Sequence, residues 1–185
     1  MALQDLETRT GLPDALRVLL EDYPRIGWES DPAFDGMIQF WLDRHMMFRR
    51  IVEKLETDAQ DLLDKKLDPK SYKSHMSKLG SMFVNQLHQH HQVEDFHYFP
   101  VLSKRDARIE SGFGILDKDH HAIDHHLQEF VSAANTTLQT DDTHLRDATA
   151  GLLSQVTGFG GLLNRHLEDE EELVVPVLLK FGPVE

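Results

Sequence analysis

The sequence predicts an all-α protein, an up-down-up-down four-helix bundle with an N-terminal helical extension. Apolar residues recur at intervals of three and four along four long segments, and no convincing alternating strand appears. The breaks between these segments are short, and short connections favour antiparallel neighbouring helices. We therefore expect an N-terminal extension over residues 1–33 and a four-helix bundle domain over residues 34–180.

The extension carries a short apolar stretch at residues 13–22, which we expect to form a helix with Pro13 near its first turn. Residues 23–32 contain two prolines and are expected to be an irregular approach to the bundle. The four longer segments carry the helical spacing, and we expect helices over residues 34–62, 70–102, 115–138 and 143–179.

Turn-forming residues mark the expected breaks at residues 68–69, 111–114 and 140–142. Asp141 or Asp142 is expected to be the N-cap of the fourth helix. Pro100 and Pro176 lie late in the second and fourth helices, where each is expected to kink or end its helix. The glycines at positions 158, 160 and 161 either allow a close helix approach or mark an irregular turn.

Composition excludes several classes of function. The 185 residues have a formal net charge of −13, which argues against nucleic acid and anionic membrane surfaces as partners. No cysteine is present, so disulfides, iron–sulfur ligation and thiol catalysis are excluded, and a cytoplasmic location is expected. The first ten residues do not have the pattern of a signal peptide, and no stretch is long and apolar enough for a membrane span.

Four histidines form two matched pairs: His45 and His90 are 45 residues apart, and His120 and His166 are 46 apart. The second member of each pair opens the same H-x3-E-x5-P pattern, which contains Glu94 and Pro100 in one copy and Glu170 and Pro176 in the other. The repetition indicates a helix-pair unit used twice. Each unit would supply two imidazoles and one carboxylate to a shared site.

Helical periodicity places these side chains on the apolar, inward faces of the four helices. A single inward histidine is most often a core residue with satisfied hydrogen bonds. A buried ionised glutamate is costly unless it is paired or coordinated, and here two glutamates each lie one turn from an inward histidine. The pattern therefore favours a metal site in the bundle core, with six nitrogen and oxygen ligands that suffice for two iron-type ions.

The run HHQVEDFHYFP at residues 90–100 resembles the pattern H-H-x-x-E-E-x-x-x-F-P of the hemerythrin-like, or HHE cation-binding, proteins. A looser copy, HLEDEEELVVP, lies at residues 166–176. The resemblance covers about residues 34–180. It implies a four-helix bundle around two Fe ions, a carboxylate-bridged di-iron centre. The implied terminal ligands are His45, His90, His120 and His166, and the implied bridging ligands are Glu94 and Glu170.

One position departs from the oxygen-carrying hemerythrins, which have a second histidine one turn after the third-helix ligand. Asp124 stands there, and it would leave one iron with an emptier shell or an oxygen in place of a nitrogen. His121 and His125 would restore the H-x3-H spacing, but they project about 100 to 140 degrees from the apolar face. The ligand set instead resembles a bacterial branch linked to iron–sulfur repair and nitric-oxide stress.

Other residues near the motif have several possible roles. His97 is expected on the inward face, as an extra ligand, a hydrogen-bond donor to a ligand or a proton relay. His91 is expected off-centre, with a supporting role behind a ligand. Tyr98 is expected near the same face, as a structural residue or a donor to a bound oxygen species. The remaining histidines are most simply surface or flanking residues: His75, His88, His126 and His144.

These patterns predict a non-haem di-iron protein that binds or senses O2, NO, reactive oxygen species or iron. The alternative is a di-iron enzyme of oxidative or nitrosative stress defence, with peroxide or NO turnover or iron–sulfur centre repair. A third reading is a helical interaction module whose metal is structural. The expected partner is a small diatomic ligand or peroxide, and a homodimer is possible.

Overall fold

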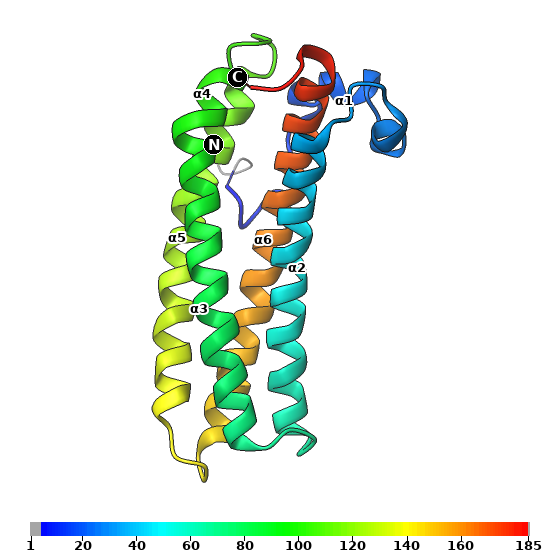
Figure 1. Cartoon of the computed structure of the whole chain (residues 1–185). Coiled ribbons are helices and arrows are strands. Elements are labelled where there is room, and N and C mark those ends of the chain that lie inside the picture. Colours follow the sequence, from blue (N-terminus) through cyan, green and yellow to red (C-terminus); the bar gives the residue numbers. More distant parts are fainter. Residues whose placement is uncertain (1–4, 185) are drawn as a thin grey trace.

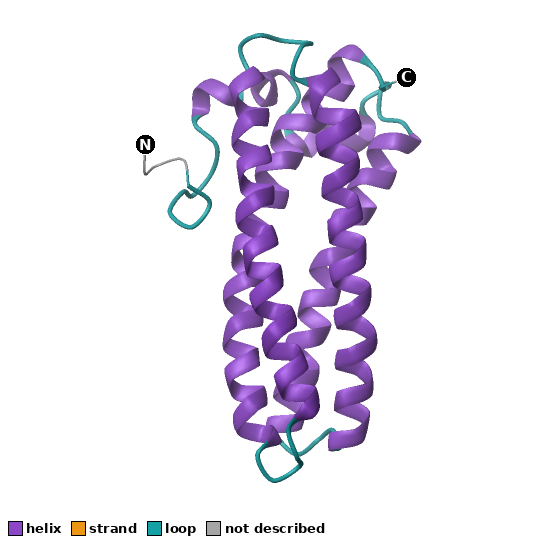
Figure 2. Ribbon diagram, turned by 90° about the vertical axis from the view of Figure 1, so that its left-hand side faces the viewer, coloured by secondary structure: helices purple, strands orange, loops and turns teal. Residues whose placement is uncertain are grey.

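The computed structural model describes residues 5–184, which are helical or looped and contain no strand, so the predicted all-α class is confirmed (Figure 2). The N-terminal part holds three short helical elements, η2 (Asp14–Leu16), α1 (Val18–Asp22) and η3 (Arg25–Ser30). The rest of the chain forms the elements α2 (Gly36–Leu63), α3 (Pro69–Val93), η4 (Glu94–Tyr98), α4 (Phe99–Leu102), α5 (Glu110–Gln139) and α6 (Leu145–Phe181).

The long helices lie side by side as a bundle, with α3 continuing through η4 into α4 (Figure 1). The links α2–α3 and α5–α6 lie at one end of the bundle, and the short N-terminal elements and the C-terminus lie at the other. In the described chain, no helix is both long and apolar enough to cross a membrane.

Aspartates cap the starts of α2 and α3. The Asp35 carboxylate accepts the backbone N–H groups of Met37 and Ile38, both at 3.0 Å, and Asp68 accepts that of Ser71 at 3.0 Å. Each aspartate thereby satisfies amides that have no partner within their own helix. Asp141 does the same for the turn that leads into α6 by accepting two backbone N–H groups, so the expected cap lies one turn earlier than the helix itself.

The predicted break at residues 111–114 is wrong, because α5 begins at Glu110 and runs through it. A Cβ on Gly112 would lie 3.0 Å from Leu173 Cδ2, so this glycine serves a close approach of α5 to α6 rather than a turn. Gly160 has the same role in α6, where a Cβ would lie 2.7 Å from Val52 Cγ1 of α2. Pro176 does not end α6, which continues to Phe181.

A π-helical turn, η4, interrupts the second long helix immediately after α3. The turn holds one more residue than an α-helical turn, so the residues beyond it are rotated by about 100° relative to a continuous α-helix. His97 is therefore exposed, contrary to the prediction, whereas Phe99 is buried. Pro100 fits this break because it lacks the N–H that a regular helix would bond to the preceding turn.

Two apolar clusters fill the interior. One contains Phe48, Phe83 and Ile123 and occupies the half of the bundle nearer the α2–α3 link. The other contains Phe99 and Leu173, and it includes the buried leucines and tryptophan of the N-terminal elements: Leu12, Leu16, Leu19 and Trp28. Between them, all four long helices contribute buried polar side chains to one layer.

Candidate metal centre

The polar layer contains all six predicted ligands and one further histidine. α2 supplies His45, the α3–η4 junction supplies His90, His91 and Glu94, α5 supplies His120, and α6 supplies His166 and Glu170. All are buried except His90, which is slightly exposed. The helical spacing therefore correctly predicted that the side chains of the six predicted ligands turn inward, whereas His91 was expected off-centre.

The seven side chains form two groups of potential ligands, and within each group one ligand atom per residue lies within 4.8 Å of the others. The mixed group combines two imidazoles with two carboxylates: His45, His90, Glu94 and Glu170. The three-histidine group consists of His91, His120 and His166.

The two glutamates face both groups. Glu94 places Oε1 2.8 Å from His90 Nε2 and Oε2 3.5 Å from His120 Nε2. Glu170 places Oε1 3.4 Å from His45 Nε2 and Oε2 3.5 Å from His166 Nε2. Each carboxylate therefore presents one oxygen to a histidine of each group.

Several of these ligand atoms have no hydrogen-bond partner within the described chain. They are both oxygens of Glu94, Oε2 of Glu170, Nε2 of His120 and His166, and both ring nitrogens of His91. A buried polar atom without a partner is costly and rare. Because these atoms converge from three helical segments, α3–η4, α5 and α6, the layer fits bound cations better than a hydrogen-bonded core.

Burial and neighbouring charges shift the pKa values of the side chains in the layer in different directions. Burial lowers the pKa of His90, His91 and His166, which keeps these imidazoles neutral and able to ligate. Burial and the nearby Glu170 raise the pKa of Glu94 well above its ordinary value. Burial alone would also raise the pKa of Glu170, but the adjacent histidines, His45 first, lower it below its ordinary range.

Three imidazoles are oriented by carboxylates behind them. The Nδ1–H of His45 donates to Glu171 at 3.0 Å, and that of His120 donates to Asp95 at 2.7 Å. His166 Nδ1 makes the equivalent contact with Asp119 at 3.3 Å. Such a bond fixes the tautomer, so that Nε2 carries the lone pair toward the centre of the layer.

Two of these three carboxylates, Glu171 and Asp119, are held in turn by arginines. Arg25 and Arg49 each donate to Glu171 at 2.7 Å. Burial would raise the pKa of Glu171, but His45 and Arg49 together lower it to about 2. Asp119 is likewise kept ionised, because Arg9 and His166 lower its pKa against the effect of burial.

An indole also contacts the centre. Trp41 Nε1–H donates to Glu170 Oε1 at 2.6 Å, so this carboxylate is held from α2 as well as from its own helix. Buried apolar side chains form a wall beside the layer: Trp41 and Phe48 pack against His90, Phe83 packs on Phe48, and Ile123 is buried in the same cluster.

His91 was expected to lie behind a ligand, but its ring stacks on that of His120 with centroids 4.0 Å apart. Adjacent helical residues point about 100° apart, so only one of two neighbouring histidines was expected to face the core. α3 instead turns His90 toward α2 and His91 toward α5 and α6. The sequence feature that could have predicted this orientation is the doublet His90-His91, which supplies one imidazole to each group.

The other candidates lie outside both groups. The side chain of Asp124 is 45% exposed, lies 3.9 Å from His88 and belongs to neither group, whereas His91 brings a third imidazole to His120 and His166 from another helix. His121 and His125 are exposed, as the periodicity predicted, and His97 is exposed because of the π turn.

A pocket of about 290 Å³ opens between α2 and the α3–η4 segment and reaches the mixed group at His90 and Glu94. Its other lining residues are mainly apolar or aromatic and include Phe40, Trp41 and Tyr98, with the cation Arg44 at one side. The three-histidine group does not line this pocket. Small molecules thus have a route to one side of the layer.

Comparison with known proteins gives one match that covers most of the chain. Residues 36–178 match the family described as the hemerythrin HHE cation binding domain. No curated protein and no solved structure gives a significant match. The matched region begins at the first residue of α2 and ends within α6, and it contains all seven residues of the polar layer.

Proposed function

This chain belongs to the hemerythrin HHE cation-binding domain family, and on that premise we propose that it holds two iron ions and binds or senses a small ligand such as O2, NO or peroxide. The long helices act as an up-down-up-down scaffold that carries the ligands on rigid elements.

The proposed ligands divide between the two groups. His45 and His90 would hold one ion, and His91, His120 and His166 would hold the other. Glu94 and Glu170, which face both groups, would be shared between the two ions. Imidazole nitrogens with carboxylate oxygens suit iron, and the two carboxylates offset part of the cation charge.

The observation that carries this proposal is the orientation of the two glutamates. Each has its two oxygens facing imidazoles of different groups at 2.8 to 3.5 Å. A single cation would leave one side of this arrangement without a partner. Two cations explain both the shared carboxylates and the buried ligand atoms that lack hydrogen bonds.

Bound iron would supply electron transfer and free coordination positions for a small ligand. The chain itself holds imidazoles toward the centre of the layer, fixes Glu170 through the Trp41 indole, and limits water with the apolar wall. The pocket at His90 provides the route by which a ligand enters, so exchange takes place at the mixed group.

The pocket also favours a second candidate, an enzyme that turns over peroxide or NO. Tyr98 and Arg44 line the pocket and provide a hydroxyl and a positive charge beside an incoming molecule. Assays of peroxide and NO consumption separate turnover from reversible binding.

Elemental analysis of the purified protein tests the proposal directly, and we expect about two iron atoms per chain. Addition of O2 or NO to the reduced protein should then change its visible spectrum. In the same elemental analysis, the control variant Glu172→Ala should keep the wild-type metal content. Glu172 lies on α6, but its carboxylate binds Arg17 and is not part of the layer. Zinc as the only metal, or a reduced protein without a spectral response, would refute iron-based sensing and favour a structural metal.

A further inference from the structure

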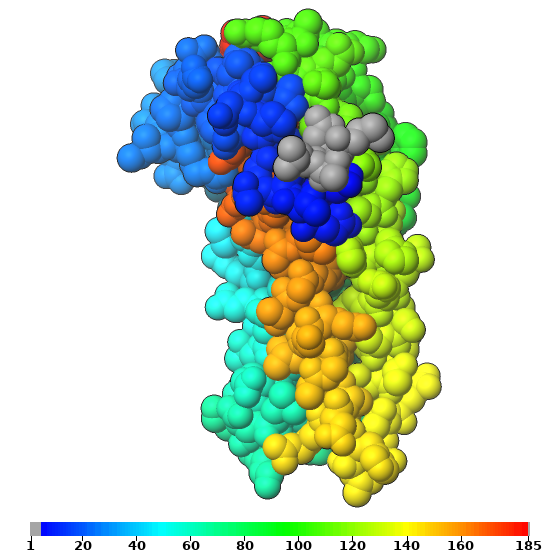
Figure 3. All heavy atoms as spheres, turned by 180° about the vertical axis from the view of Figure 1, so that it is seen from behind, coloured from blue at the N-terminus to red at the C-terminus, as the bar shows by residue number. Residues whose placement is uncertain are grey.

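Residues 5–12, which we call the N-terminal strap, lie across α6 and reach α5 on one side of the bundle (Figure 3). Leu6 and Leu12 are buried, the former in the cluster with Phe48 and the latter in the cluster with Phe99. The strap therefore connects the two apolar clusters at the level of the polar layer between them.

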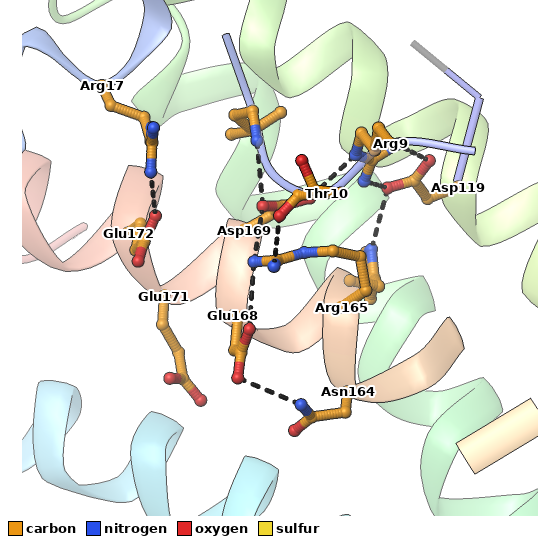
Figure 4. Close-up of polar contacts among 12 residues, drawn as sticks. Arg9, Thr10, Arg17, Asp119, Asn164, Arg165, Glu168, Asp169, Glu171 and Glu172 are labelled. Carbon is orange, nitrogen blue, oxygen red and sulfur yellow. Dashed lines mark hydrogen bonds and ion pairs between the residues drawn. The ribbon is translucent and has the colours of Figure 1, made fainter. Parts of the chain in front are cut away.

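Arg9 is the centre of this segment, and its side chain is 1% exposed. Its Nε donates to Asp169 Oδ2 at 2.8 Å, its Nη1 donates to Asp119 Oδ1 at 2.7 Å, and its Nη2 donates to Asp119 Oδ2. Figure 4 shows the guanidinium between the two aspartates. One cation thus joins α5 to α6 through two buried carboxylates.

Both aspartates immediately precede a proposed metal ligand: Asp119 precedes His120, and Asp169 precedes Glu170. Asp119 also contacts His166 Nδ1. The guanidinium holds both oxygens of Asp119, a geometry that fixes the plane of a carboxylate. A fixed carboxylate in turn fixes the ring that donates to it, so Arg9 acts on His166 through a single intervening residue.

Further contacts hold the strap in place. Leu12 N–H donates to Asp169 Oδ1 at 3.1 Å, and Arg165 donates to the carbonyl oxygen of Thr10 at 2.6 Å. Arg165 also pairs with Asp169 at 2.9 Å. Asp169 therefore keeps two partners without Arg9, whereas the Asp119 carboxylate keeps only its contact with His166 among the residues that the structure describes. Loss of Arg9 should consequently affect the orientation of His166 most.

We propose that Arg9 is a positioning residue for the three-histidine group: by holding Asp119 it orients His166, and it thereby slows release of the metal ion bound there. The inference rests on the proposed function, because it requires an ion in this group. It adds that a residue of the extension, outside the matched domain, sets the metal retention of one group and leaves the other group unchanged.

The test compares iron release from the loaded proteins to an excess of a ferrous chelator. In Arg9→Met we expect one ion per chain to leave about tenfold faster or more, as is typical when a residue behind a metal ligand is lost. The second ion should leave at the wild-type rate. Arg17→Met is the matched control, because Arg17 lies in the same extension but pairs with Asp14 and Glu172 outside the layer, and both of its rates should be unchanged.

A His91→Ala background assigns the effect to a group. The three-histidine group is already weakened there, so adding Arg9→Met should not accelerate release of the remaining ion. Asp119→Asn is a second route, since it keeps the side-chain shape and the fold if Arg9→Met fails to fold, and it should also release one ion faster. Arg9→Lys keeps the charge but cannot hold both oxygens of Asp119 together with Asp169, so we expect an intermediate rate.

Faster release of both ions by the same factor would show a merely structural role for Arg9 and overturn the inference. Unchanged release in both Arg9→Met and Asp119→Asn would also overturn it. Wild-type protein that retains no transition metal would instead refute the proposed function itself, and that result is obtained before any variant is made.

Discussion

The two groups of the metal centre have similar ligands but very different enclosures. In the mixed group, His45 is supported by Glu171, which is held by Arg25 and Arg49 with side chains 47% and 24% exposed. In the three-histidine group, His166 contacts Asp119, and Asp119 is held by Arg9, whose side chain is 1% exposed. The pocket between α2 and α3 reaches only the mixed group.

This difference in enclosure suits the two groups to different roles, ligand exchange and metal retention. An ion that exchanges ligands needs access to solvent, while retention of the pair needs at least one site closed to water and to competing chelators. Electrostatic contacts are also stronger where water is excluded. We infer that the mixed group handles ligands and the three-histidine group anchors the centre.

The largest effect is expected from Glu170→Ala, because Glu170 faces both groups and the change removes a ligand from each. We expect loss of both ions, measured by elemental analysis of protein purified under identical conditions. Glu168→Ala is the control on the same helix, since its carboxylate accepts from Asn164 and lies outside the layer. Retention of one full ion would show that Glu170 serves a single group.

Next in size is His91→Ala, which tests the unequal division of histidines between the groups. It removes one of three imidazoles from the closed group, and we expect about one ion per chain to be lost while the mixed group keeps its own. His97→Ala is the matched control, because His97 is exposed within the π turn and its loss should leave the metal content unchanged. Two tightly held ions in His91→Ala would remove His91 from the ligand set.

A smaller effect is expected from removing both arginines that hold Glu171, in the double variant Arg25→Ala with Arg49→Ala. Both are partly exposed, so their contacts are screened by water and salt. Affinity for the ion in the mixed group should fall only severalfold in a chelator competition, and the fall should shrink at high salt. A loss as large as that of Arg9→Met would contradict the proposed difference between the two groups.

The smallest change in metal content is expected from Trp41→Phe, which removes the N–H donor to Glu170 but keeps an aromatic wall. Both ions should remain. The free energy of unfolding should fall by about 2 kcal/mol, the order expected for a hydrogen bond to a charged group, in urea titrations. The reduction potential of the centre should also shift, and an unchanged potential would show that this bond does not tune the bridging carboxylate.

The repeated spacing was sufficient to predict the bundle and six residues of the layer, because histidine and glutamate one turn apart must share a helix face. His91 was assigned a supporting role because its orientation depends on how α3 sits between its neighbours, and periodicity along one helix does not contain that information. The helical spacing did not predict the π turn, for a related reason. The sequence showed Pro100, but a proline alone does not reveal an inserted residue.

Arg9 and Gly112 show a second limit. Arg9 contacts Asp119 and Asp169, which are 110 and 160 residues away, so no local pattern marks it as part of the site. Gly112 was interpreted as a turn residue because the side chain that requires a glycine there, Leu173, lies on another helix. Packing between distant segments decides both cases.

The placement of the polar layer between two apolar clusters has a consequence for cooperativity. Each cluster can stabilise its own part of the bundle, and the layer that separates them is unfavourable when its carboxylates and imidazoles lack cations. With metal bound, the whole chain should melt in a single transition. After chelation, the end that carries the chain termini should open first, in a separate step at lower temperature.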